Sequence, residues 1–415
     1  METNIWVYAD WVLHHANEPC QVGVLTASVI RNKELFSFAY DSEWLDSPYA
    51  LQIDPELQLF DGRQFSSGNN FRVFLDSCPD RWGRLLMKRR EAVIAKQQER
   101  NPVLLREIDY LLGVHDQYRM GGLRFKREPE GAFMDNNSKL SAPPISSLRE
   151  LEYAATQIES NQNSDDPEYV KWLYMLISPG SSLGGARPKA SVIDEKNALW
   201  IAKFPSLYDE HDIGGWEYVT CQLALKAGIN MAECRLMQYK NRHHTFLTRR
   251  FDRDAGKRIH FTSAMTQLGY YDGDYEASYL ELAEFLILQG AQTQQDLEQL
   301  WRRIVFNIAV SNTDDHLRNH GFLLSKNGWK LSPAYDINPV TPAHGLHLNI
   351  NETDNRLDID LAFEVIDYFQ IKPDRAKTIK EEVFQSVKNW DKQAKEIGLG
   401  RLEIEQMAGA FNTAR

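Results

Sequence analysis

A run of polar residues near position 315, together with an acid beyond a predicted hairpin, constrains this chain more than any other feature. The run is Asn312-Thr313-Asp314-Asp315-His316-Leu317-Arg318-Asn319, and the later acid is Asp336. Between Asn319 and Asp336 lie two apolar runs joined by Asn327-Gly328, a dipeptide typical of tight hairpins because both residues adopt positive φ readily. We therefore expect a hairpin with Asn319 at its entrance and Asp336 just past its exit, so that both face one site.

The order of these side chains is that of a phosphoryl-transfer site. Four residues separate Asp314 from Asn319, as they separate the basic Asp from the metal-binding Asn in the protein-kinase catalytic loop. In such a site one carboxylate accepts the proton of the attacking hydroxyl, and the amide and a second carboxylate hold magnesium against nucleotide phosphates. The alternative is that an Asp/Asn-rich stretch merely turns the chain and caps a helix. The ordered carboxylate, amide and carboxylate favour the catalytic interpretation.

Composition excludes several classes of protein. The 415 residues, 43% hydrophobic and 25% charged, predict a soluble globular protein of about two to three domains. We expect a cytoplasmic protein, because no apolar run reaches the roughly 18 residues of a membrane span and the N-terminus does not resemble a signal peptide. The four widely spaced cysteines are predicted to be reduced core thiols. A net charge of -11 indicates that any contact with DNA is made through a partner.

The pattern along the chain predicts an α+β fold in several parts. We expect an α/β region over residues 1–125, a linker over 126–148, a nucleotide-gripping region over 149–255 and a mainly helical catalytic lobe over 256–415. Helical spacing predicts helices over residues 82–96, 102–112, 145–159, 167–176, 276–290, 293–310, 358–369, 373–397 and 402–411.

A glycine-rich stretch from Ser178 to Lys189 is a candidate phosphate-binding loop. Small residues let backbone N–H groups approach phosphate oxygens. Gly180 and Gly185 have the separation of a Walker A motif, but Ala186-Arg187 stands where Lys-Ser/Thr is required. The alternative is a flexible connection.

The residues that follow favour the phosphate-binding interpretation. Two strand-like runs at residues 190–193 and 198–204 form a predicted hairpin that carries Lys203, and a helix beginning near residue 214 carries Glu217. In kinases a lysine in this position contacts the α/β-phosphates and forms an ion pair with a glutamate of the following helix, so we expect Glu217 to reach Lys203. For either residue alone, a solvated surface charge is the alternative.

These motifs together resemble the HipA-type serine/threonine kinases, the toxin half of bacterial HipA/HipB toxin-antitoxin modules. The resemblance covers nearly the whole chain. Beyond the segments above, it includes Asp80-Arg81-Trp82-Gly83, Asp109-Tyr110-Leu111-Leu112-Gly113, Gly121-Gly122-Leu123-Arg124-Phe125, Arg250-Phe251-Asp252-Arg253 and Ala334-Tyr335-Asp336.

The resemblance implies a bilobed, protein-kinase-like fold preceded by an N-terminal α/β subdomain, with ATP and Mg²⁺ as cofactors. It implies phosphorylation of a serine on a translation component, with aminoacyl-tRNA synthetases as the substrate class, and a HipB-like DNA-binding antitoxin as partner. Asp314 is similar to the catalytic base, Asn319 and Asp336 to the metal ligands, and Ser182, with Ser181 as the alternative, to the autophosphorylated serine. The residues implied to contact ATP are Ser182, Leu183, Gly184, Gly185, Ala186, Arg187, Lys189, Lys203, Glu217, Thr248, Arg249, Arg250, Phe251 and His316.

Some residues depart from the family pattern or leave choices open. Asp315 stands where some members carry Gly, and we expect an extra negative charge near the metals. His316 and His320 have the spacing of a zinc motif, but Leu317 replaces its Glu, so we expect His316 to buttress Asp314 by a hydrogen bond instead. A catalytically silent kinase-like co-repressor, or a sugar or lipid kinase, is the alternative function.

Overall fold

The computed structural model describes residues 2–11, 18–136, 142–160, 167–177, 187–239, 241–274 and 276–414. Their contacts divide them into two compact units. The first comprises Met1–Leu207 with Asp252–Thr262, and the second comprises Tyr208–Phe251 with Ser263–Arg415. The chain crosses between the units more than once, and the boundaries expected near residues 125, 148 and 255 stay predictions.

The first unit contains an antiparallel sheet of five strands in the order β4-β3-β2-β1-β5. Its strands are β1 (Glu2–Ala9), β2 (Cys20–Ile30), β3 (Lys33–Tyr40), β4 (Gln64–Phe65) and β5 (Leu123–Lys126). Every second residue of β1 from Ile5 to Ala9 is buried, as expected of a strand with one face on the core. The short helices α1 (Ser42–Asp46), α2 (Arg72–Leu75), α4 (Glu107–Leu112) and η1 (Asp116–Tyr118) connect the strands.

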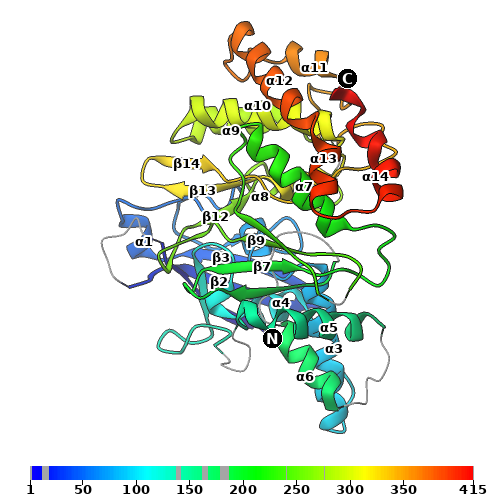
Figure 1. The fold of residues 1–415 in the computed structure, drawn as a ribbon. Coiled ribbons are helices and arrows are strands. Elements are labelled where there is room, and N and C mark those ends of the chain that lie inside the picture. The colour runs from blue at the N-terminus through cyan, green and yellow to red at the C-terminus, as the bar shows by residue number, and fades with distance from the viewer. Residues whose placement is uncertain are drawn as a thin grey trace. The chain divides into compact units, whose positions relative to one another are not determined.

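Three longer helices and a strand pair complete the first unit. Helix α3 (Arg81–Gln97) begins at Asp80, whose side chain caps the first turn by accepting from the Gly83 N–H. Helices α3 and α5 (Leu148–Ser160, preceded by η3, Ile145–Ser147) both contact α6 (Pro167–Ile177) (Figure 1). Strands β6 (Lys189–Ile193) and β7 (Leu199–Lys203) form the predicted antiparallel pair.

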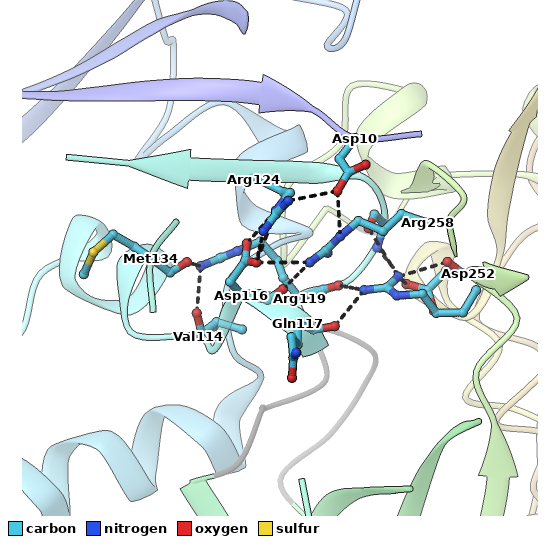
Figure 2. Close-up of polar contacts among 11 residues, drawn as sticks. Asp10, Val114, Asp116, Gln117, Arg119, Arg124, Met134, Asp252 and Arg258 are labelled. Atoms are coloured by element: carbon cyan, nitrogen blue, oxygen red, sulfur yellow. Dashed lines mark hydrogen bonds and ion pairs between the residues drawn. The ribbon is translucent and has the colours of Figure 1, made fainter. Parts of the chain in front are cut away.

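The segment Asp252–Thr262 joins the first unit through buried charges (Figure 2). It carries β10 (Arg253–Asp254), β11 (Lys257–Arg258) and most of β12 (Phe261–Ser263). Arg258 donates to the carbonyl of Asp116 at 2.6 Å, and Arg253 donates to the carbonyls of Arg119 at 2.8 Å and Gln117 at 3.1 Å. Arginine donors therefore fasten this segment to the turn around Asp116.

The second unit is mainly helical, as predicted, around α10 (Thr293–Val310). Every residue of α10 from Leu300 to Val310 is buried, so this helix forms the centre of the unit's core. It contacts α9 (Tyr279–Gln289), α11 (Ile359–Glu364), α12 (Pro373–Val387) and the strand β14 (Gly328–Leu331) (Figure 1). The remaining elements are α7 (Ile213–Lys226), β8 (Cys234–Met237), β9 (Thr245–Arg249), α8 (Ala264–Gln267), η4 (Leu317–Asn319), β13 (Gly321–Ser325), α13 (Trp390–Glu396), α14 (Arg401–Met407) and η5 (Ala408–Ala414).

The hairpin predicted between Asn319 and Asp336 is present as β13 and β14, but its turn lies one residue earlier than expected. Ser325 pairs with Gly328, so Lys326 and Asn327 form the turn and Gly328 is already in the strand. Among the helices, the predicted span 373–397 is two helices, α12 and α13, and α11 ends at Glu364.

The cysteine prediction is wrong for one pair. Cys221 of α7 and Cys234 of β8 are joined as a disulfide, while Cys20 and Cys78 are free. The pair comes together because α7 packs on β8, a contact between elements that the spacing of the cysteines does not reveal. In the part of the chain that the structure describes, no helix has the length and apolarity needed to cross a membrane.

Candidate active site

The polar loop, residues 312–319, begins where α10 ends. Ser311 caps the helix in the left-handed conformation, and its hydroxyl donates to the carbonyl of Ala410 at 2.7 Å. Asn312 is fully buried. Its amide donates to Oδ1 of Asn307 at 3.1 Å and accepts from the Asn338 N–H at 3.3 Å. The entry to the loop is thus fixed both to α10 and to the segment that follows Asp336.

The two adjacent acids of the loop lie in opposite environments. Asp314 is exposed, whereas Asp315 is 3% exposed. Oδ2 of Asp315 accepts from the Tyr279 hydroxyl at 2.5 Å and from Nδ2 of Asn307 at 2.7 Å, and it lies 2.8 Å from Nε2 of His320. The expectation that Asp315 adds a free negative charge beside the candidate metal ligands is wrong, because its carboxylate points into the core and fastens the loop there.

The charge state of Asp315 follows from these contacts. Burial raises the pKa of its carboxyl, but His320 and the hydrogen bonds from His320 and Tyr279 outweigh burial. The net result is a pKa below the usual range of an aspartate. Asp315 is accordingly ionised at neutral pH and remains an acceptor for all three neighbours.

Asn319 lies at the end of η4 and is 4% exposed. Its Nδ2 donates to the backbone carbonyl of Asp314 at 2.9 Å, and its N–H donates to the carbonyl of His316 at 2.8 Å. Because the amide nitrogen holds the backbone at Asp314, the amide oxygen is the atom that suits a metal ion.

Asp336 emerges from the same end of the hairpin as Asn319. Phe322 pairs with Leu331, and the Ser332 N–H donates to the carbonyl of Gly321 at 2.8 Å, which closes that end. The Tyr335 hydroxyl donates to the carbonyl of Arg318 at 2.7 Å and ties the Asp336 segment to the loop.

The backbone at Asp336 adopts an uncommon conformation. Its φ is 57°, in the left-handed region that few residues other than glycine enter. Conformations of this kind cost free energy and occur often at functional sites, where the surrounding structure holds them in place. The side chain of Asp336 accepts from Nδ2 of Asn338 at 3.4 Å.

The available donors fit magnesium better than a transition metal. Within the described residues, no group of three or more His, Cys, Asp or Glu side chains could hold a metal. One amide oxygen from Asn319 and one carboxylate from Asp336 suit Mg²⁺, which keeps several waters and completes its shell with substrate phosphates. The donors are oxygens, as the chemistry of Mg²⁺ requires.

His316 contacts Asp314 through its backbone, since its N–H donates to the carbonyl of Asp314 at 2.9 Å. Its ring packs edge-on against His347, with centroids 5.8 Å apart, and its Nδ1 is buried without a hydrogen-bond partner among the described residues. The ring of the neighbouring His320 contacts the other acid of the loop, with its Nε2 2.8 Å from Oδ2 of Asp315. The reason is the turn of η4, which sends His320 into the core beside α9.

Comparison with known families shows which family the chain belongs to. The model of the HipA-like C-terminal domain matches residues 181–390, half of the chain, which includes the polar loop, the hairpin and Asp336. The chain belongs to the HipA-like family. The toxin HipA from a Shewanella oneidensis MR-1 complex of HipA, HipB and operator DNA has the same fold, with a TM-score of 0.64 and 18% identity over 98% of this chain and 95% of that one.

A curated relative is similar to part of this HipA-like chain. A Haemophilus influenzae protein named "Putative kinase" is 28% identical over 185 residues, which cover 39% of this chain. The match spans 54% of that relative's length, about half of it.

The HipA-like nucleotide loop was predicted from residues that lie mostly outside the described part of the chain. Ser181, Ser182, Leu183, Gly184, Gly185 and Ala186 are among the residues that the structure does not describe. Arg187 and Lys189 follow them, and both have protein partners. Arg187 donates to the carbonyl of Phe204 at 3.1 Å.

Lys189 was predicted to contact ATP, but the structure gives its ammonium another partner. Nζ of Lys189 lies 2.6 Å from Oδ2 of Asp80, and both side chains are 4% exposed. Lys203 stands half-buried at the end of β7, and Glu217 is buried in α7. Lys203 belongs to the first unit and Glu217 to the second, so the ion pair between them remains a prediction.

Four of the residues implied to contact ATP, Thr248, Arg249, Arg250 and Phe251, lie on β9 or directly after it, and β9 pairs with β8. Of its candidate residues, Arg250 is buried, whereas Arg249 is exposed and its guanidinium lies 3.2 Å from Glu233. The Phe251 ring lies 5.5 Å from the ring of Tyr335. The end of this strand therefore reaches the residue next to Asp336. Thr248 pairs with Cys234, and its contact with adenine remains a prediction.

The sequence did not reveal the residues that anchor the loop in the core by hydrogen bonds to Asp315. Tyr279 and Asn307 lie on α9 and α10, 36 and 8 residues from Asp315. Nothing in their local sequence distinguishes them from ordinary helix residues. His320 carried a signal, since it lies four residues after His316, but that spacing was considered only for zinc.

Proposed function

We propose that this HipA-like protein is an ATP-dependent serine/threonine protein kinase and the toxin of a HipA/HipB-type toxin-antitoxin module. One observation carries the proposal. The exposed Asp314 lies on a loop that the buried Asp315 anchors in the core, beside Asn319 and at the same end of the hairpin as Asp336. Family membership and a HipA fold support it.

The chemistry that we propose assigns one task to each side chain. Asp314 accepts the proton of a serine hydroxyl as that oxygen attacks the γ-phosphate of ATP. Asn319 and Asp336 hold Mg²⁺, which neutralises charge on the phosphates when bound. Lys203, paired with Glu217, contacts the α/β-phosphates, and the end of β9 receives the adenine.

The proposed acceptor is a serine of a translation component, with an aminoacyl-tRNA synthetase as the first candidate. We also propose autophosphorylation on Ser182 or Ser181 of the glycine-rich loop. A HipB-like DNA-binding antitoxin is the proposed partner, because the similar Shewanella structure is a complex with HipB and operator DNA. The net charge of -11 supports contact with DNA through that partner alone.

Incubation with γ-labelled ATP and magnesium, alone and with cell extract, tests the proposal. We expect label on a loop serine and on one or a few acceptor proteins, each identified by mass spectrometry of phosphopeptides. Thermal stabilisation by ATP and magnesium without any labelled product would favour the silent co-repressor. Label in a small-molecule or lipid fraction would favour a sugar or lipid kinase.

A further inference from the structure

The stretch that follows the glycine-rich loop is fastened to helix α3 of the same unit by a buried ion pair. Oδ2 of Asp80 lies 2.6 Å from Nζ of Lys189, and Oδ1 of Asp80 accepts from the Gly83 N–H at 2.8 Å. The Trp82 indole donates to the carbonyl of Lys189 at 3.1 Å. Asp80 and Trp82 together hold both the side chain and the backbone of Lys189.

The register of the β6–β7 pair links this attachment to Lys203. Lys189 stands directly opposite Lys203 in the antiparallel ladder. Residues directly opposite in such a ladder lie on the same face, with Cβ atoms about 5 Å apart, and like charges there repel. The carboxylate of Asp80 neutralises the charge of Lys189. Lys189 therefore does not repel the ammonium of Lys203, its neighbour across the strand pair.

Two further hydrogen bonds stiffen the same corner. The Phe204 N–H donates to the carbonyl of Pro188 at 2.9 Å, and Arg187 donates to the carbonyl of Phe204. The residue after Lys203 is therefore bound to the residue before Lys189. A displacement of Lys189 would be transmitted to Lys203 through these bonds.

We propose that Asp80 and Lys189 form a buried clamp that positions Lys203 for the phosphates of ATP. The inference rests on the proposed function for the role of Lys203, while the clamp itself rests on the contacts. Asp80 and Lys189 are positioning residues, because they act through Lys203. On this account Lys189 does not itself contact the nucleotide.

Three variants test the clamp: Asp80→Asn, Lys189→Met and the double variant. Asn is also a good N-cap, so Asp80→Asn leaves the start of α3 capped while it removes the carboxylate. Lys189→Met keeps the length of the side chain and removes its charge. The double variant leaves no unpaired buried charge, and it carries the same prediction if Asp80→Asn fails to fold.

The first readout is hydrogen exchange of β6 and β7 without nucleotide, which does not depend on kinase activity. We expect faster exchange in all three variants than in the wild type. Unchanged exchange in them would overturn the clamp. The second readout is the Kd of ATP with magnesium, which we expect to rise about tenfold in each single variant, and no further in the double variant.

Several outcomes of the second readout are decisive. If Asp80→Asn leaves the Kd unchanged or lowers it while Lys189→Met raises it, Lys189 contacts the phosphates and the clamp is wrong. If exchange rises without a change in Kd in any variant, the clamp does not position Lys203. If the wild type neither binds ATP nor transfers phosphate, the proposed function fails, and the exchange readout still tests the attachment.

Glu107→Gln is the matched control. Glu107 lies in α4 and pairs with Arg84 of α3, the helix that Asp80 caps, with Oε1 2.6 Å from Nη1. Among the described residues, no hydrogen bond or ion pair joins Glu107 to β6. This variant should lower the unfolding midpoint and leave the Kd of ATP unchanged. A rise in Kd equal to that of Asp80→Asn would show general loosening of α3 and would overturn the positioning role.

Discussion

At the scale of the residue, the adjacent carboxylates of Asp314 and Asp315 lie in opposite environments. Asp314 is exposed, while Asp315 is buried and is held by Tyr279, Asn307 and His320. Asp315→Asn should therefore lower the free energy of unfolding by about 3 kcal/mol, because an amide cannot accept from all three neighbours. Chemical denaturation measures this change. Asp314→Asn is the control and should alter stability by less than about 0.5 kcal/mol.

The lowered pKa of Asp315 also predicts a dependence on pH. A carboxyl whose pKa is lower in the folded state binds its proton more weakly there than in the unfolded chain. Its stabilisation is present above the unfolded pKa of about 3.9 and is lost as the pH falls through the folded pKa. Denaturation midpoints between pH 2 and pH 7 should thus fall in acid less steeply for Asp315→Asn than for the wild type. Parallel curves would contradict this.

Residues of the candidate site that are close in sequence could be selected from their spacing. The separation of four intervening residues from Asn319 selected Asp314 rather than Asp315 as the base; Asp314 is exposed, and its role stays a prediction. The burial of Asp315 was not predictable, since Tyr279 and Asn307 reach it from two helices. The partner of Lys189 was not predictable either, because Asp80 lies 109 residues away.

At the scale of the element, the β13–β14 hairpin was predicted correctly, but turn preference alone does not explain the glycine in it. The Asn327-Gly328 pair marked a hairpin, but Gly328 is a strand residue with φ of 127°. A Cβ on Gly328 would lie 2.5 Å from the carbonyl oxygen of Gln289, at the end of α9. Glycine is required there by packing on α9 as well as by the backbone.

Gly328→Ala should therefore destabilise the protein more than the strain of a positive φ alone would, because it adds a steric clash. We expect a loss of about 2–4 kcal/mol, since the new methyl group meets backbone atoms that cannot easily move. Gly398→Ala is a matched control, with φ of 86° and open space around its Cβ. It should cost about 1 kcal/mol. Equal losses in thermal or urea unfolding would show that Gln289 is not a constraint.

The apolar periodicity predicted the bounds of a helix well where the periodic pattern covers a single helix. Helices α3, α6 and α10 begin and end within about two residues of their predicted bounds. The span 373–397 was predicted as one helix because its apolar spacing continues across the break. The chain turns at Lys388 and Asn389, where no glycine or proline marks the end of α12.

At the scale of the whole molecule, the return of Asp252–Thr262 to the first unit depends on Asp116 (Figure 2). Its carboxylate accepts from Nε of Arg124 at 3.0 Å and lies 3.4 Å from Nη2 of Arg258. Burial raises the pKa of Asp116, but hydrogen bonds from Arg124 and the charge of Arg258 outweigh it, and the pKa is lowered.

Asp116→Asn should loosen that segment before the rest of the chain. Removing the carboxylate leaves the buried Arg258 and the half-buried Arg124 with less compensating charge, a cost of about 3 kcal/mol. Hydrogen exchange followed by mass spectrometry should show faster exchange at Asp252–Thr262, with the α10 core of the second unit unchanged. Equal acceleration in both units would contradict the division into two units.

The contacts within a unit between residues far apart in sequence were the least predictable part of the fold. Local composition placed a linker at residues 126–148, yet Pro144 forms a bridge with Ile193 within the first unit. Charge pairs such as Arg258 with Asp116 join residues 142 positions apart. Residue propensity and periodicity carry information about local structure only. Contacts between residues this far apart in sequence depend on the tertiary structure.

We propose that Asp314 is the base of a kinase, and a comparison of one variant with the wild type tests this role. Transfer of the γ-phosphate of ATP by Asp314→Asn and by the wild type is measured beside the Kd of ATP with magnesium. We expect transfer to fall by roughly 10²–10⁴-fold, with the Kd within about twofold of the wild type, because the base acts mainly in the transition state. Transfer by Asp314→Asn at the wild-type rate would contradict the account.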